Sequence, residues 1–174
     1  MCGVVGILSS NVDNIFNKTN QLLKIFRHRG PDNTGIWIDK DNQISLGHLR
    51  LSILDLSSSG NQPMTSSNDR YKIVYNGEIY NFKSLKLELE KENNIKWKSS
   101  TDTEVLLEYI SKYGLENSLK KINGMYAFGL WDKKEKKLVI CRDRFGEKPL
   151  YYGWIGKDFV FLKFQIFLPF LIFQ

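Results

Sequence analysis

A cysteine at position 2 is the residue in this sequence best suited to nucleophilic chemistry. It lies between the initiator Met1 and Gly3, and a second residue this small permits removal of Met1. Cysteine would then carry a free α-amine, whose reference pKa of about 7.7–8 suits a general base for its own thiol. The alternative interpretation is a chance Met-Cys start with an inert thiol, and the dipeptide alone leaves both open.

Four further residues carry groups that bind charged or polarised ligands. Arg50 follows an apolar run and could hold a carboxylate through a bidentate pair, although a single arginine equally suits a surface. Asn76 and Gly77 offer a side-chain amide and a backbone N–H for an oxyanion, or else a tight hairpin turn. Asp102 begins a predicted helix, where it could recognise an ammonium group or cap the helix N-terminus.

Other chemistries lack their sequence signatures. His28 and His48 have no cysteine or acidic partner at metal-ligand spacing, so no metal site is predicted. There is no Gly-rich phosphate loop of the Walker type, and the segment from Gly3 to Gly6 is not a dinucleotide fingerprint. The 25 Lys and Arg exceed the 19 Asp and Glu by six, but acids lie among the basic residues. We therefore expect no nucleic-acid partner.

Length and composition predict a soluble globular protein of one domain, or of one domain with an appendage. The chain has 174 residues, of which 42% are hydrophobic and 25% charged. Two cysteines, Cys2 and Cys141, do not form a disulfide framework, and no signal peptide is recognisable. These features predict a cytoplasmic protein in which Cys2 stays a free thiol.

Short apolar runs alternate with turn residues along the chain. Helices are predicted at 14–26, 80–93 and 102–113, and strands at 4–8, 35–39, 44–51, 71–75, 125–131, 138–142, 150–154 and 159–161. Thr101 and Glu104 form a capping box before the third helix, and Gly114 ends it. A polar loop is expected at 57–68. Strands at both ends with helices between them favour an α+β layered fold.

Seven motifs together resemble the glutamine amidotransferase domain of glutamine-hydrolysing asparagine synthetases. They occur in the family's order and cover Met1 to about Phe161. The motifs are Met1–Ile7, Arg27–Asp32, Leu46–Asp55, Tyr75–Asn81, Thr101–Leu107, Gly124–Phe128 and Arg142–Tyr152. The resemblance implies the N-terminal nucleophile hydrolase fold, a four-layer αββα sandwich of two antiparallel sheets.

The resemblance also implies a role for each candidate residue. Cys2 would attack the side-chain amide of glutamine, release ammonia and form a thioester that water hydrolyses to glutamate. Its α-amine would shuttle the proton, while Asn76 and Gly77 would hold the tetrahedral oxyanion. The predicted substrate-binding residues are Arg50 for the α-carboxylate, Gly77, Glu78 and Asp102 for the α-ammonium, and Leu51 and Ile53 beside them. This half needs no cofactor or metal. ATP and magnesium are expected only in a synthetase domain, which this sequence lacks.

The end of the sequence departs from the family. We place the domain at 1–161 and an atypical apolar tail at 162–174, where the family continues with a small, acidic Ser-Glu segment. The change resembles a shift of reading frame near Phe161 or Leu162. The tail is too short for a membrane-spanning helix. It predicts a poorly soluble or self-associating chain, in addition to a possible family-type dimer.

Four functional hypotheses remain at this point. The first is a glutaminase domain whose ammonia is transferred to aspartate. The second is a truncated chain without turnover, the third an amidotransferase half that serves another carboxylate, and the fourth a basic binding module.

Overall fold

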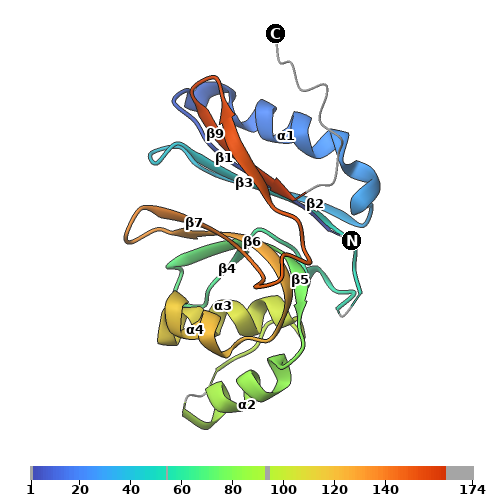
Figure 1. Ribbon diagram of the computed structural model, residues 1–174, viewed down its shortest axis with the longest axis vertical. Coiled ribbons are helices and arrows are strands. Elements are labelled where there is room, and N and C mark those ends of the chain that lie inside the picture. Colours follow the sequence, from blue (N-terminus) through green and yellow to red (C-terminus); the bar gives the residue numbers. More distant parts are fainter. Residues whose placement is uncertain (1, 54, 93–94, 164–174) are drawn as a thin grey trace.

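Two antiparallel sheets form the centre of the molecule in the computed structural model, which describes residues 2–53, 55–92 and 95–163 (Figure 1). The first sheet has the order β2-β3-β1-β9-β8 and the second the order β4-β5-β6-β7. The strands are β1 (Gly3–Leu8), β2 (Asn33–Asp39), β3 (Ile44–Arg50), β4 (Met64–Thr65), β5 (Tyr71–Ile79), β6 (Gly124–Asp132), β7 (Lys137–Arg142), β8 (Tyr151–Ile155) and β9 (Asp158–Lys163).

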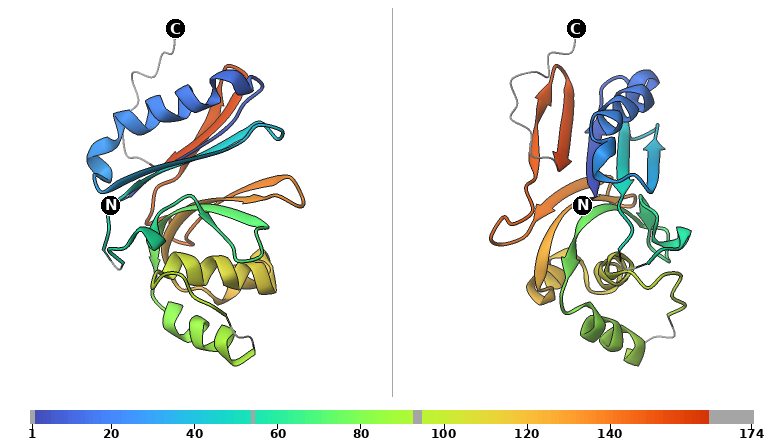
Figure 2. Two further views of the ribbon diagram at one scale, coloured as in Figure 1. Left: turned by 180° about the vertical axis from the view of Figure 1, so that it is seen from behind. Right: turned by 90° about the vertical axis from the view of Figure 1, so that its right-hand side faces the viewer.

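Helices cover the outer face of each sheet. They are α1 (Ile15–Ile25), α2 (Phe82–Glu92), α3 (Asp102–Tyr113) and α4 (Leu115–Lys121), with short 3-10 helices at Val12–Asn14, Arg27–Arg29 and Ser58–Gly60. Helix α1 lies on the first sheet, and α2, α3 and α4 lie on the far side of the second (Figure 2). The order of layers is therefore helix, sheet, sheet, helices, which confirms the predicted αββα sandwich.

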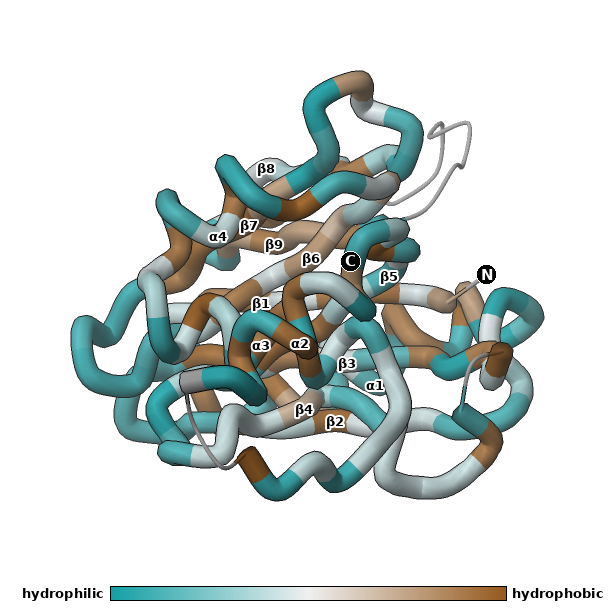
Figure 3. The backbone as a smooth tube through the Cα atoms, turned by 90° about the horizontal axis from the view of Figure 1, so that it is seen from below, coloured by the Kyte–Doolittle hydropathy of each residue, from teal (hydrophilic) through white to brown (hydrophobic). Residues whose placement is uncertain are grey.

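Three apolar clusters hold these layers together. One packs α1 against the first sheet through residues such as Leu22 and Val5, and another packs α3 against the second through Leu106 and Phe128. The third fills the space between the sheets. It consists of Val4, Ile44, Leu46, Val74, Trp131 and Phe161, and we call it the inter-sheet cluster. In Figure 3, hydrophobic residues accordingly lie along the central strands and helices, while the residues of the peripheral loops are largely hydrophilic.

Most predicted elements are confirmed, and the differences have physical causes. Two elements were not predicted from the sequence: α4, a seven-residue helix that directly follows Gly114, and β4, a two-residue strand within the expected polar loop. Half of the capping box is present, because Thr101 Oγ1 accepts from Glu104 N. The carboxylate of Glu104 instead accepts from the backbone N–H groups of Lys98 and Ser99.

The tight turn considered for Asn76 and Gly77 is wrong. Strand β5 continues through both residues to Ile79 and pairs with β6 along its whole length, with Asn76 opposite Ala127 and Gly77 opposite Tyr126. A Cβ on Gly77 would lie 2.4 Å from the carbonyl oxygen of Met125. Close approach of two strands, rather than a left-handed turn, therefore explains the glycine here.

Strand β9 runs two residues past the expected end of the domain. Leu162 pairs with Val5 on one side and Tyr151 on the other, and Lys163 pairs with Val4. The rest of the predicted tail, 164–174, lies outside the described residues, so its effect on solubility stays a prediction. None of the helices in the described ranges is long and apolar enough to cross a lipid bilayer.

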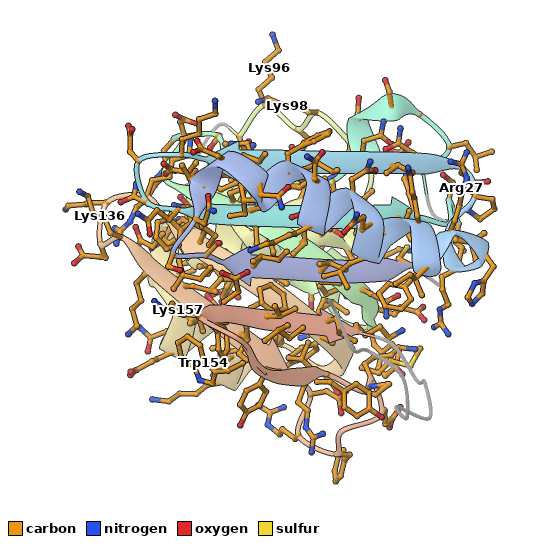
Figure 4. All side chains as sticks on the ribbon, turned by 90° about the horizontal axis from the view of Figure 1, so that it is seen from above. Arg27, Lys96, Lys98, Lys136, Trp154 and Lys157 are labelled. Atoms are coloured by element: carbon orange, nitrogen blue, oxygen red, sulfur yellow. The ribbon has the colours of Figure 1, made fainter. Side chains whose placement is uncertain are left out.

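Basic side chains labelled in Figure 4 point outward at separate margins of the molecule. Lys96 and Lys98 lie on one side, while Arg27, Lys136 and Lys157 lie at other edges. These five residues do not form a continuous basic stripe of the kind that follows a nucleic-acid backbone. That the chain has no nucleic-acid partner stays a prediction.

Candidate active site

One pocket of about 220 Å³ collects all eight candidate residues at one end of the two sheets. Its size suits a ligand smaller than a typical drug molecule. The candidate residues that line it are Cys2, Arg50, Leu51, Ile53, Asn76, Gly77, Glu78 and Asp102. They come from both sheets, from the loop after β3 and from the start of α3.

A polar layer continues the inter-sheet cluster at this end of the sandwich. Side chains two residues apart on a strand share a face, so each strand can extend the cluster by one further residue. Three strands do so with a polar side chain, and the residue directly before β1 extends the cluster in the same way. The pairs are Val4 and Cys2, Leu46 and His48, Val74 and Asn76, and Phe161 and Lys163. We call Cys2, His48, Asn76 and Lys163 the polar layer.

Cys2 lies directly before β1 and against the end of β3. The backbone N–H of Leu51 donates to Cys2 Sγ with 3.4 Å between nitrogen and sulfur, and Sγ lies 3.6 Å from the carbonyl oxygen of Leu51. These contacts fix the thiol at the mouth of the inter-sheet space. Cys2 is a free, half-buried cysteine.

Asn76 faces Cys2's sheet from β5, because it shares the inner face of β5 with Val74. It is 4% exposed, and its Nδ2 has no hydrogen-bond partner among the described residues. A buried amide N–H without a partner costs free energy unless a ligand satisfies it. The arrangement therefore suits a donor whose partner arrives with the substrate.

Arg50 is buried at the end of β3, where it holds the loop that follows. Nη1 donates to the carbonyl oxygen of Ser57 at 2.5 Å and to Asn61 Oδ1 at 2.8 Å, and Nη2 donates to the carbonyl oxygen of Asp55. A guanidinium has five N–H groups, so these three bonds leave two for a ligand. Gly60 makes room for it, since a Cβ there would lie 2.3 Å from Nη2.

Asp102 is the first residue of α3 but not its cap. Thr101 caps the helix, whereas Asp102 Oδ2 accepts from Tyr75 Oη and from the backbone N–H of Ile79, each at 2.9 Å. Thr101 and not Asp102 is therefore the N-cap, whereas Asp102 lies in the first turn, where its carboxylate also interacts with the backbone N–H of Thr103. Burial raises the pKa of Asp102 above its ordinary value, while these hydrogen bonds act in the opposite direction.

The rim of the pocket is more exposed than its floor. Ile53 is 75% exposed, Glu78 is also exposed and Leu51 is half-buried. These side chains can contact a ligand from the solvent side. Glu78 adds a second carboxylate near Asp102, and it acts to raise the pKa of Asp102.

Sequence reasoning missed two members of the polar layer. His48 was considered only as a metal ligand, and Lys163 was assigned to the tail. Lys163 is only 1% exposed, and burial, together with Arg29 and Lys148, lowers its pKa to about 8. Alternation along β3 and β9 was the available signal, because both residues follow inward-facing apolar residues by two positions. Within the described ranges, no group of three or more His, Cys, Asp or Glu could hold a metal ion.

His48 makes stability depend on pH. It is fully buried, and desolvation lowers its pKa from 6.5 to about 3. The unfolded chain therefore takes up this proton first, so stability present above pH 6.5 is lost as the pH falls toward about 3. Between pH 7 and pH 5 we expect a loss of roughly 2 kcal/mol from this group, which His48→Gln should remove.

Urea unfolding of both proteins at the two pH values measures this difference. All other titrating groups are common to the two chains, so they cancel in the comparison. An equal loss of stability in the two proteins would contradict the lowered pKa of His48.

The layers and the pocket define a class of protein. Two facing antiparallel sheets between helices, with Cys2 at one end of the inter-sheet space, form the fold of the N-terminal nucleophile hydrolases. Glutamine phosphoribosylpyrophosphate amidotransferase from Bacillus subtilis has a similar fold, with a TM-score of 0.75 over 92% of this chain and 41% of that chain at 24% identity.

Sequence comparison narrows the class to a family. The model of the glutamine amidotransferase domain matches residues 1–163, and the chain belongs to this family. A protein of Methanocaldococcus jannaschii named as glutamine-hydrolysing asparagine synthetase 2 is 43% identical over 92% of this chain and 33% of its own length. Asparagine synthetase 1 of Bacillus subtilis is 37% identical over 92% of this chain and 25% of its own. The chain thus spans a third or less of these relatives.

Proposed function

We propose that the chain is a cysteine-dependent glutaminase that hydrolyses glutamine to glutamate and ammonia. The observation that carries the proposal is the single pocket in which Cys2 meets complements for every polar part of glutamine. Arg50 offers N–H groups for the α-carboxylate, and Asp102 with Glu78 offers negative charge for the α-ammonium. Asn76 offers its unpartnered Nδ2 for the side-chain oxygen.

The proposed reaction proceeds in two steps through a thioester. In the first step the thiol of Cys2 adds to the side-chain carbonyl carbon of glutamine while its proton passes to the α-amine of Cys2. Asn76 Nδ2 and the backbone N–H of Gly77 stabilise the resulting oxyanion. The carbon–nitrogen bond then breaks as the α-amine returns the proton to the departing nitrogen, which leaves as ammonia.

In the second step water attacks the thioester. The α-amine accepts a proton from the water as the new carbon–oxygen bond forms. The carbon–sulfur bond then breaks, glutamate leaves, and the α-amine returns the proton to Sγ, which restores the thiol of Cys2. These steps balance with groups of this chain and water alone. They require removal of Met1, which intact-mass measurement of the purified protein detects directly.

The use of the ammonia follows from the names of the relatives. Because these are asparagine synthetases, we infer that the ammonia amidates the side-chain carboxylate of aspartate in an ATP- and magnesium-dependent domain. Mixing the chain with glutamine, aspartate, ATP, magnesium and such a domain from a relative should yield asparagine. Release of glutamate without asparagine in that mixture would point to another acceptor.

Replacing Arg50 with lysine should weaken glutamine binding more than it slows the reaction. Lysine keeps the positive charge but loses the planar fork that a carboxylate accepts in two places. We expect KM for glutamine to rise about tenfold, which corresponds to about 1.4 kcal/mol, while kcat changes less.

The matched control for Arg50 is Asn61→Ala. It removes one of the bonds that hold the guanidinium but leaves the guanidinium itself. KM should therefore rise less in Asn61→Ala than in Arg50→Lys. A KM in Arg50→Lys equal to that of the unaltered chain would remove Arg50 from the substrate site.

A further inference from the structure

His48 lies between the two halves of the proposed glutaminase site. It belongs to β3 in the first sheet, pairs in register with Val4 of β1, and is completely buried. Its ring reaches across to the second sheet, where Nε2 lies 3.2 Å from the carbonyl oxygen of Tyr75 on β5. Tyr75 immediately precedes Asn76. One hydrogen bond thus connects the sheet of the nucleophile to the backbone beside the oxyanion donor.

The partner of Nε2 determines which nitrogen carries the hydrogen. A carbonyl oxygen only accepts, so Nε2 must donate and Nδ1 must be unprotonated in the neutral ring. Burial keeps the ring neutral, because it lowers the pKa of His48 to about 3. Nδ1 is buried and has no hydrogen-bond partner within the described ranges. The ring is therefore held in one tautomer across the neutral pH range, with a single protein anchor.

The anchor of the His48 ring, the carbonyl oxygen of Tyr75, lies on an edge of β5 that has no neighbouring strand at this point. The short strand β4 pairs only with Lys72 and Ile73, so the outer edge of β5 is free of strand partners at Tyr75. Side chains replace the missing strand: Gln62 Oε1 accepts from the backbone N–H of Tyr75 at 2.6 Å, and His48 donates to its carbonyl oxygen. The hydroxyl of Tyr75 is bound to Asp102. Every polar group of Tyr75 is thereby fixed before a substrate arrives.

We propose that His48 is a positioning residue that sets the placement of Asn76 relative to Cys2 through its hydrogen bond to the carbonyl oxygen of Tyr75. This inference rests on the proposed glutaminase reaction and extends it. An oxyanion donor is effective only when it is held at about 2.7–3.1 Å from the place where charge develops. A shift of about 1 Å between the sheets at Tyr75 would misplace Nδ2 of Asn76 without touching the groups that bind the ends of glutamine.

Replacing His48 with glutamine or with asparagine separates the effect of the hydrogen bond to Tyr75 from the effect of having a polar side chain at this position. The side-chain nitrogen of glutamine reaches about as far as Nε2 of histidine, whereas asparagine is one methylene shorter. We therefore expect His48→Gln to keep most of kcat, and His48→Asn to lose at least about tenfold in kcat with less than a twofold change in KM.

Ser45→Ala is the matched control for the loss of a buried polar group on the same strand. Ser45 is a buried polar residue of β3 on the face toward α1, where it accepts from Thr19 Oγ1 at 2.9 Å. This variant should lose stability yet keep kcat. If His48→Asn and His48→Gln lose kcat equally, or if KM rises as much as kcat falls, His48 does not act through the bond to Tyr75.

A double-mutant cycle with Asn76→Ala tests whether His48 acts through Asn76. In that background His48→Asn should lower kcat by less than about twofold, because the donor that it positions is already gone. An equal loss in both backgrounds would overturn the inference while leaving the glutaminase reaction intact. If Asn76→Ala alone leaves kcat unchanged, the proposed oxyanion role fails instead, and the inference fails with it.

Discussion

Replacing Cys2 with alanine should abolish glutamate release from glutamine, with a loss of at least about 10⁴-fold in kcat. The expected loss is this large because one residue supplies both the attacking thiol and, through its α-amine, the general base. Alanine at this position keeps the amine but removes the atom that forms the thioester. Glutamate release measured on protein of verified N-terminal mass is the appropriate assay.

Cys141 provides the matched control for Cys2. It is a half-buried free cysteine on β7, and burial with the nearby Asp143 raises the pKa of its thiol to about 11. Cys141→Ala should therefore keep full activity, since a thiol that stays protonated at neutral pH is a poor nucleophile. Activity of Cys2→Ala above a few per cent of the unaltered chain would rule out the thioester route. No turnover in the unaltered chain would favour the interpretation as an inactive fragment.

Replacing Asn76 with alanine should lower kcat about 10²–10³-fold while KM for glutamine stays within about threefold. The substrate carbonyl carries little charge before attack, so the hydrogen bond from Nδ2 strengthens mainly in the transition state. The absence of any partner for Nδ2 among the described residues fits this assignment, because the truncation removes no hydrogen bond from Nδ2 to those residues. Steady-state kinetics over a range of glutamine concentrations separates the two constants.

Asn81→Ala serves as the comparison for Asn76→Ala. Asn81 lies just beyond β5, and its side chain binds the carbonyl oxygen of Lys121 and the backbone N–H of Asn123. This variant should lose stability but retain kcat. A parallel rise in KM and fall in kcat for Asn76→Ala would show that Asn76 maintains the structure of the pocket instead of stabilising the oxyanion.

The elements that sequence predicted well carry strong local signals. The strand pair at β2 and β3 follows from two short segments that flank the turn residues 40–42, and α3 follows from the Thr101 cap and Gly114. The prediction of a turn failed at Asn76 and Gly77, because an Asn-Gly pair favours a tight turn when only the neighbouring residues are considered. Nine consecutive pairings with β6 outweigh that preference, and the glycine serves close strand approach instead.

By itself, the sequence determined the chemical groups of the site. Cys2, Arg50, Asn76, Gly77, Glu78 and Asp102 could be chosen from residue type and from their surrounding motifs, and all of them line one pocket. These motifs predicted the family as well as the αββα layers. The reason is that reactive side chains and strand-forming runs are properties of short segments, which a sequence displays directly.

Only the tertiary structure decided how these groups are held. Alternation along a strand shows which residues share a face, but it does not show which face meets a second sheet. The facing of β3 against β5 fixes the tautomer of His48 and leaves Nδ2 of Asn76 without a partner among the described residues. The packing of α3 beside β5 brings the Asp102 carboxylate to the hydroxyl of Tyr75. Lys163, at the end of β9, is buried as a member of the polar layer. Each of these features depends on atoms tens of residues apart in the chain, so local sequence could not predict them.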